Sequence, residues 1–267
     1  MKEEEKKLRR EFYQLEKSYR PYFDFLTENQ DDYSEYKGAV TIDGYLNYEP
    51  DILLLSYNPA HGKYRDWNKD GAHLVYTGER PFGLFEEGNA RKKGCWWETN
   101  KHYKFYASNI DFIYAYQTEI NGHSEYGTQK RPAWEKKDYI ETTIMCLNIY
   151  PIATEDCANL INLFKKMKRN HAIPEIESLK DEWEIRKEFI YKMHKFIENF
   201  VKPKAILCLG KQTMSDYTWG KFKEEEDGIY KSNEYPNVVG ISRSGTWTKR
   251  AQYAAKLVAD IVKQKNS

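Results

Sequence analysis

Four short, uninterrupted apolar runs constrain the fold of this chain more than any other feature of its sequence. They lie at residues 52–56, 143–148, 205–210 and 238–242. A short apolar run without alternation is typical of a strand that is buried on both faces, as in a parallel sheet. The runs therefore predict four parallel strands at the centre of the fold.

Segments with apolar residues at helical spacing precede, separate and follow these strands. The expected helices lie at residues 3–29, 155–168, 181–200, 211–217 and 248–264. Strands that alternate with helices are joined by right-handed crossovers, which put helices on both faces of the sheet. We therefore predict an α/β fold, a three-layer α/β/α sandwich around a central four-stranded parallel sheet.

The chain of 267 residues is long enough for one large domain with an elaborated edge. We expect residues 1–49 to form an N-terminal helix and a lead-in that pack on the core, and residues 50–267 to form the α/β domain. The stretch at about 62–140 is rich in glycine, aromatic and basic residues, and an insertion of helices and loops is expected there. The charged residues 223–227 are expected to form a solvated loop.

The charge balance and the apolar pattern limit the partners of the chain. Its 42 basic and 41 acidic residues give a net charge of +1, so a DNA-binding surface has to come from local clustering. The sequence has no run of about 18 apolar residues, so no membrane span is predicted. Its start also lacks the apolar run of a signal peptide, and a cytoplasmic location is therefore expected. The four cysteines form no CxxC pair, and we expect neither a metal nor a cofactor.

Distinctive polar residues follow each of the four apolar runs. In an open parallel sheet, ligands bind beyond the carboxyl ends of the strands. The four ends carry, in chain order, Tyr57-Asn58-Pro59-Ala60-His61, then Asn148, then Gly210-Lys211-Gln212, and then Ser242-Arg243-Ser244-Gly245. Together they predict a binding site at this edge of the sheet.

The order of these motifs resembles that of the uracil-DNA glycosylase superfamily. After its first strand that family has Gly-Gln-Asp-Pro-Tyr-His, or Gly-Ile-Asn-Pro-Gly in the mismatch-specific branch, and Ser-Tyr-Asn-Pro-Ala-His at residues 56–61 is similar to both. Its last motif is His-Pro-Ser, or Asn-Pro-Ser-Gly, and here Ser242 and Arg243 replace the first two residues. The resemblance covers about residues 50–262 and is closest to the branch with the Asn-Pro motif.

The resemblance implies a monofunctional DNA glycosylase that needs no cofactor, binds DNA and acts as a monomer. Such an enzyme flips a uracil or a C5-modified pyrimidine out of the helix and hydrolyses its N-glycosidic bond, leaving an abasic site. DNA repair and defence against modified viral DNA are the expected roles.

The resemblance also implies roles for single residues. As catalytic residues, Asn58 orients the water through its carbonyl and His61 contacts the water or a phosphate. Asn148 reads the pyrimidine edge. The alternative interpretation makes Asn58 part of a turn and Asn148 the cap of a strand end.

The substrate-binding residues expected from the resemblance also include Tyr57, Ala60, Phe82, Phe85 and Ser242. Ala60 stands where the most uracil-specific branch has a tyrosine, so it leaves the C5 edge of the base open. One phenylalanine ring is expected to stack on the flipped base. The DNA-binding residues expected near the last motif are small, cationic or aromatic: Arg243, Ser244, Gly245, Trp247, Lys249 and Arg250.

Two other functions remain open at this stage. A catalytically inactive nucleic-acid-binding module of the same fold is suggested by Ser242 and Arg243, which depart from the family motif. A doubly wound hydrolase of small molecules is disfavoured, because the chain has no Gly-x-Ser-x-Gly elbow, P-loop or Gly-x-Gly-x-x-Gly motif.

Overall fold

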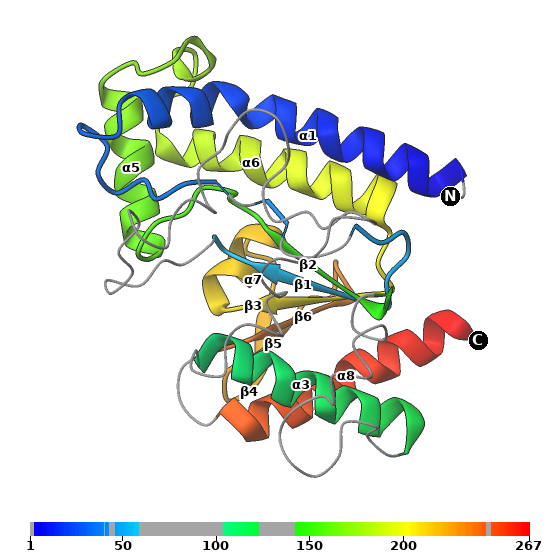
Figure 1. The fold of residues 1–267 in the computed structure, drawn as a ribbon. Helices are drawn as coiled ribbons and strands as arrows, with labels where there is room; N and C mark the ends of the chain where they lie inside the picture. Colours follow the sequence, from blue (N-terminus) through cyan, green and yellow to red (C-terminus); the bar gives the residue numbers. More distant parts are fainter. Residues whose placement is uncertain (1–2, 40, 43–45, 59–103, 123–141, 244–246) are drawn as a thin grey trace. The chain divides into compact units, whose positions relative to one another are not determined.

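The structure is a computed structural model that describes residues 3–39, 41–42, 46–58, 104–122, 142–243 and 247–267 (Figure 1). Its helices and strands are, in chain order, α1 (Glu3–Glu28), β1 (Ile52–Ser56), α3 (Lys104–Asn121), β2 (Ile144–Asn148), α5 (Cys157–Arg169), a 3₁₀ turn (Pro174–Ile176), α6 (Glu182–Phe196), a π-helical turn (Ile197–Val201), β3 (Ala205–Leu209), α7 (Lys211–Tyr217), β4 (Lys223–Glu226), β5 (Ile229–Lys231), β6 (Val238–Ile241) and α8 (Trp247–Asn266). None of these helices combines the length and the apolar character that crossing a bilayer requires.

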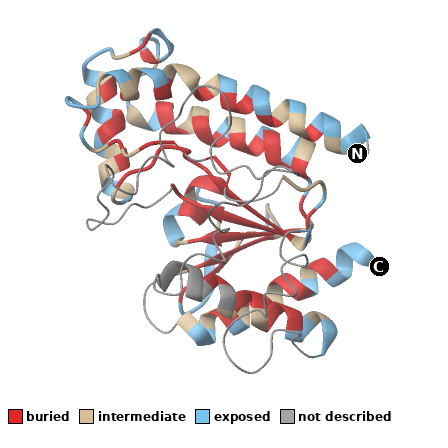
Figure 2. Cartoon of the chain, in the orientation of Figure 1, coloured by how far each residue is buried: buried red, intermediate tan, exposed pale blue. Residues whose placement is uncertain are grey.

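The four predicted strands are present as β1, β2, β3 and β6, and the α/β class is confirmed. Every residue of these four strands is buried, as the apolar runs indicated (Figure 2). The predicted sheet of four parallel strands is wrong, however, because the sheet has six strands in the order β2-β1-β3-β6-β5-β4. Whereas β1, β3 and β6 are parallel, β5 is antiparallel to β6, and β4 is antiparallel to β5.

The β4–β5 hairpin accounts for this error, since residues 223–226 were expected to be loop. All four residues of β4 are exposed, and main-chain pairing with β5 rather than burial holds the strand in place. A strand without a buried face leaves no apolar pattern in the sequence. Its charges suit the edge of a sheet, where they discourage pairing with another chain.

The helices predicted from apolar spacing are confirmed as α1, α5, α6, α7 and α8. Two of them begin at aspartate caps: the Asp156 carboxylate accepts from the Asn159 N–H at 2.8 Å, and the Asp181 carboxylate from the Glu184 N–H at 3.0 Å. Each cap satisfies an N–H group that the helix itself leaves unpaired. Within the expected insertion, α3 is described, and residues 62–103 and 123–140 lie outside the described residues.

The described residues form two compact units. The first contains residues from 3–46, 57–58 and 147–200, and the second contains 47–56, 104–122, 142–146 and 201–267. In the first unit, α1 and α6 run side by side (Figure 1).

Aromatic rings form the core of the first unit. The buried Phe189 of α6 stacks on Tyr19 of α1 at 4.9 Å between ring centroids, and it meets the edge of Tyr22 at 4.8 Å. It also packs against Phe164 of α5 at 5.4 Å and against Tyr150 at 6.1 Å. Large rings in contact bury much apolar area and restrain one another. A share of the high aromatic content therefore serves this core.

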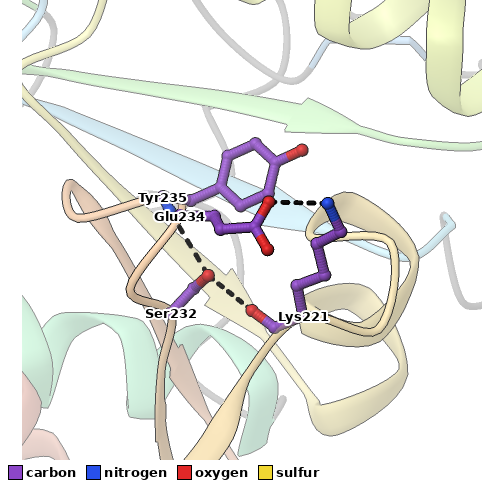
Figure 3. Close-up of polar contacts among 4 residues, drawn as sticks. All are labelled: Lys221, Ser232, Glu234 and Tyr235. Atoms are coloured by element: carbon purple, nitrogen blue, oxygen red, sulfur yellow. Dashed lines mark hydrogen bonds and ion pairs between the residues drawn. The ribbon is translucent and has the colours of Figure 1, made fainter.

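In the second unit, α3 and α8 pack together along one face of the sheet, and α7 packs against β3 and β6 (Figure 1). The residues after α7 are tied to the connection between β5 and β6. Lys221 Nζ pairs with the Glu234 carboxylate at 2.6 Å, and the Ser232 hydroxyl donates to the Lys221 carbonyl and accepts from the Tyr235 N–H (Figure 3). These contacts lie on the amino side of β6, whereas Ser242 follows its carboxyl end.

Candidate functional site

The carboxyl ends of β1 and β2 lie together. The backbone N–H of Tyr150, two residues after β2, donates to the carbonyl of Tyr57, the residue after β1, at 2.9 Å. The two candidate asparagines therefore belong to adjacent strand ends, since Asn58 follows Tyr57 and Asn148 is the last residue of β2. Both asparagines are in the first unit.

The side-chain amide of Asn58 has a fixed orientation. Its Nδ2 donates to the Ile152 carbonyl at 3.2 Å and to the Thr154 hydroxyl at 2.9 Å. Because a main-chain carbonyl only accepts hydrogen bonds, the amide nitrogen has to face Ile152. The residue is only 7% exposed. Oδ1, with two acceptor lone pairs, is thereby held as the accepting atom of this group.

Thr154 links Asn58 to the start of α5. The Thr154 hydroxyl donates to the Asp156 carbonyl at 2.6 Å, and Asp156 is the residue that caps α5. Thr154 is fully buried. This hydroxyl is costly to remove, because one amide proton of Asn58 would then stay unsatisfied in a buried position, although the Asp156 carbonyl would keep the Leu160 N–H at 3.3 Å. The amide of Asn58 is therefore positioned by a helix start.

Residues 37–39 and 41–42 lie beside the end of β2 and the residues that follow it. Asn148 donates its backbone N–H to the Thr41 carbonyl at 2.9 Å, and Leu147 forms an antiparallel bridge with Ile42. Asn148 is 6% exposed. Nearby in α1, burial raises the pKa of Glu16 from 4.5 to about 7, and the Thr41 side chain partly opposes this rise. Glu16 of α1 thus lies close to Thr41, whose carbonyl supports the backbone of Asn148.

Tyr57, a predicted substrate-binding residue, lies in the aromatic core of the first unit. It is 5% exposed, and its ring meets the edge of Tyr150 at 4.8 Å. The phenol of Tyr150 in turn accepts a hydrogen bond from Nε of the buried Arg186 at 3.3 Å. The Arg186 guanidinium also lies 4.7 Å from the ring centroid of Trp183. Arg186 is a buried charge near the strand ends, and no motif in the sequence pointed to it.

Ser242 lies in the second unit, directly after β6. Its backbone N–H donates to the Gly228 carbonyl at 2.6 Å, so the turn of the β4–β5 hairpin supports the residue. Ser242 is half-buried, and Arg243, the next residue, is exposed. The strand end that carries the last motif is therefore built partly by a hairpin that the family resemblance did not predict.

The three described candidates on α8 have different surroundings. Trp247 begins the helix and is half-buried, and Lys249 is exposed. Arg250 is held by the hairpin turn, because its Nε donates to the Asp227 carbonyl at 2.8 Å and its Nη2 pairs with the Asp227 carboxylate at 2.7 Å. Lys249 therefore presents its charge to solvent, whereas the Arg250 charge faces Asp227.

The structure distributes the predicted site residues over both units. Tyr57, Asn58 and Asn148 belong to the first, and Ser242, Arg243, Trp247, Lys249 and Arg250 belong to the second. Six further candidates lie outside the described residues: Ala60, His61, Phe82, Phe85, Ser244 and Gly245. Among the residues that are described, no three or more His, Cys, Asp and Glu side chains are grouped to hold a metal ion.

No protein-family model matches the chain, and a search of curated proteins found no match. The resemblance to the glycosylases therefore depends on the motifs and on the arrangement of the strand ends. Sequence reasoning did not identify Thr154 or Thr41 as supports of the asparagines. A signal existed for the first, because Thr154 and Asp156 directly precede a helix, where such residues act as caps. Thr41 lies in no recognisable motif.

Proposed function

We propose that this chain is a DNA glycosylase of the uracil-DNA glycosylase type, which hydrolyses the N-glycosidic bond of a flipped pyrimidine and leaves an abasic site. The proposal includes the finer fold, a sandwich with helices on both faces of the sheet. Uracil is the default substrate. A C5-modified pyrimidine is the alternative substrate, because a small residue such as Ala60 leaves room at the C5 edge of the base.

The orientation of the Asn58 amide is the observation that carries this proposal. Hydrolysis of an N-glycosidic bond requires a water molecule placed against the sugar carbon as the base departs. With Nδ2 anchored on Ile152 and Thr154, Oδ1 is an oriented acceptor that suits such a water. An amide is not a strong base, so Asn58 would act by positioning the water rather than by removing its proton.

The other candidates take the remaining roles in this proposal. Asn148, at the adjacent strand end, would read the Watson–Crick edge of the base with its amide. Ser242 and Ser244 would hold the base or a phosphate, and the exposed cations Arg243 and Lys249 would contact the DNA backbone. His61 would contact the water or a phosphate.

A catalytically inactive DNA-binding module is the second candidate, and one observation favours it. Both amide protons of Asn58 are used within the protein, and the residue is 7% exposed. Such an arrangement also suits an asparagine that only closes a turn after a strand. Binding without base release would then be the activity of the chain.

An excision assay separates the two candidates. Duplexes carrying a single uracil or a single C5-modified cytosine are incubated with the protein and treated with alkali, which breaks the strand at an abasic site. We expect the wild-type protein to give the break and Asn58→Ala to lose it while still binding the duplex. Asn29→Ala is the matched control, because Asn29 also donates to a main-chain carbonyl, that of Phe25, at 2.8 Å, but at the end of α1.

Each result of this assay decides one point. Release of no base by the wild-type protein, with binding to DNA retained, would favour the inactive module. Equal release by the wild-type protein and by Asn58→Ala would remove the assigned role of Asn58 and leave the reaction itself standing.

A further inference from the structure

Tyr230 and Ser242 lie on the same face of the sheet, at the end of β6. In the antiparallel pair of β5 and β6, Tyr230 is opposite Gly240. Ser242 is two residues beyond Gly240 along the chain, so its side chain points to the same face as that of Tyr230. The Ser242 hydroxyl forms a hydrogen bond with the Tyr230 phenol. This pair exists because the sheet has the extra strand β5.

The ring of Tyr230 is held firmly in this position. Tyr230 is 4% exposed, and its ring meets the edge of Phe222 at 5.5 Å. A Cβ atom at Gly240 would lie 2.9 Å from Met214 Cγ and 3.1 Å from Tyr230 Cβ. The absence of a side chain at Gly240 thus lets Met214 of α7 and Tyr230 approach the same point of β6. A ring packed in this way has little freedom to move its hydroxyl.

The charges around the phenol favour its protonated form. Burial is the largest effect and raises the pKa of Tyr230; the Glu224 carboxylate and, more weakly, Asp227 raise it further. The hydrogen bond from Ser242 and the charge of Arg250 oppose this rise without reversing it. At neutral pH the phenol is therefore a neutral hydrogen-bond donor.

A cation lies beside this ring as well. Lys211, the first residue of α7, has its Nζ 5.8 Å from the ring centroid of Tyr230. Lys211 is exposed, and Ser242 is half-buried. The phenol thus has a hydroxyl and an ammonium group beside it where β3 and β6 end, in addition to the Glu224 and Asp227 carboxylates that keep it protonated.

We propose that the Tyr230 phenol, oriented by Ser242, donates a hydrogen bond to the pyrimidine base as it leaves the sugar. This inference rests on the proposed glycosylase function. When the bond between C1′ and N1 breaks, its electron pair stays on the base, and the negative charge spreads to the ring oxygens. Water supplies the oxygen that bonds to C1′, and its proton ends on the released base. Tyr230 keeps its own proton and stabilises the charge that develops in the transition state.

The test compares Tyr230→Phe with wild type on uracil and on 5-fluorouracil in the same duplex. Loss of a donor to a developing anion lowers kcat about 100- to 1,000-fold, so we expect a loss of that size with uracil and little change in KM. Fluorine makes the base a better leaving group, which needs less help, so the loss should be smaller with 5-fluorouracil. Tyr235→Phe is the control: it removes a phenol from the loop on the amino side of β6 (Figure 3) and should leave kcat unchanged.

Two results would overturn the inference. One is an unchanged kcat for Tyr230→Phe, and the other is an equal loss with both bases. If Tyr230→Phe unfolds below the assay temperature, Ser242→Ala takes its place, and it should show the same dependence on the leaving base.

If the wild-type protein releases no base, the proposed glycosylase fails, and calorimetric binding of free uracil decides the donor role alone. Weaker binding by Tyr230→Phe than by Tyr235→Phe would then support the donor, and equal binding would overturn it.

Discussion

Thr154 joins Asn58 to the first turn of α5, accepting from the Asn58 amide at 2.9 Å and donating to the Asp156 carbonyl at 2.6 Å. A residue that was predicted to act on substrate is thereby held by a residue that has no predicted role. The precision of a water-positioning amide depends on such supports, because a misplaced acceptor aligns the water poorly.

Thr154→Val should lower both stability and activity. It leaves one amide proton of Asn58 without a partner in a buried place, which costs about 1–3 kcal/mol in the free energy of unfolding. The Asp156 carbonyl loses one donor and keeps the Leu160 N–H at 3.3 Å. If the proposed function holds, kcat should fall while KM changes little, since Thr154 would act through Asn58. Urea unfolding and the excision assay measure the two effects.

Thr218→Val is the control for this substitution. Thr218 is also fully buried, and its hydroxyl donates to the Met214 carbonyl at 2.7 Å. That carbonyl keeps the Thr218 N–H as a second donor, at 3.0 Å. A smaller loss of stability is expected, without an effect on kcat. Equal losses in the two variants would contradict a special role for Thr154.

Gly228→Ala should disrupt the hairpin that supports Ser242. Gly228 has a φ of +72°, and a Cβ atom there would lie 2.5 Å from Arg250 Nε and 2.9 Å from Ser242 Cβ. Gly220→Ala provides the comparison, since Gly220 has a φ of +75° and no atom within 4 Å of the added Cβ. Backbone strain of about 1–2 kcal/mol is common to both variants. The extra loss of stability in Gly228→Ala therefore measures the close approach of Arg250 and Ser242, and equal losses would show that the turn gives way freely.

The central strands could be predicted from the sequence because burial on both faces leaves an uninterrupted apolar run. The residues of β1 and β3 are all buried, and their boundaries agree with the runs to within one residue. The hairpin could not be predicted in this way. Its outer strand β4 is exposed at every position and depends on main-chain pairing with β5, which has no counterpart in side-chain pattern.

The candidate site shows the same contrast. Asn58 and Asn148 could be proposed because polar residues stand out after apolar strands. The partners that orient them come from other parts of the chain, since Thr154 lies 96 residues from Asn58. Tyr230 reaches Ser242 only through the antiparallel register of β5 with β6. Contacts of this kind depend on topology, which the motifs alone do not specify.

Glu16 should make the stability of the protein depend on pH. Burial raises the pKa of this carboxyl from 4.5 to about 7, so the folded state binds the proton more tightly than the unfolded state. The contribution of Glu16 to stability is full below about pH 4.5 and is lost as the pH rises to about 7. The total loss is about 3 kcal/mol. Above pH 7 no further change from this residue is expected.

Glu16→Gln checks this prediction, because glutamine does not titrate. The difference in unfolding free energy between the variant and the wild-type protein, measured in urea at pH 5 and pH 8, should shift by a large part of those 3 kcal/mol in favour of the variant at pH 8. Glu188→Gln on α6 serves as a control for the loss of one carboxylate. A difference that does not vary with pH would show that Glu16 is ionised in the folded protein at both values.

Lys249 and Arg250 are adjacent cations on α8 that should behave differently. Lys249 is exposed, so Lys249→Ala should weaken DNA binding and reduce the slope of log K against log salt concentration by about 0.9, the value for one phosphate contact, at an unchanged Tm. Arg250→Lys should instead lower Tm, because a lysine cannot keep both the bond to the Asp227 carbonyl and the pair with its carboxylate. Salt titrations with a short duplex and thermal unfolding separate the two effects. A lower salt slope at an unchanged Tm for Arg250→Lys would mean that Arg250 leaves Asp227 to bind a phosphate.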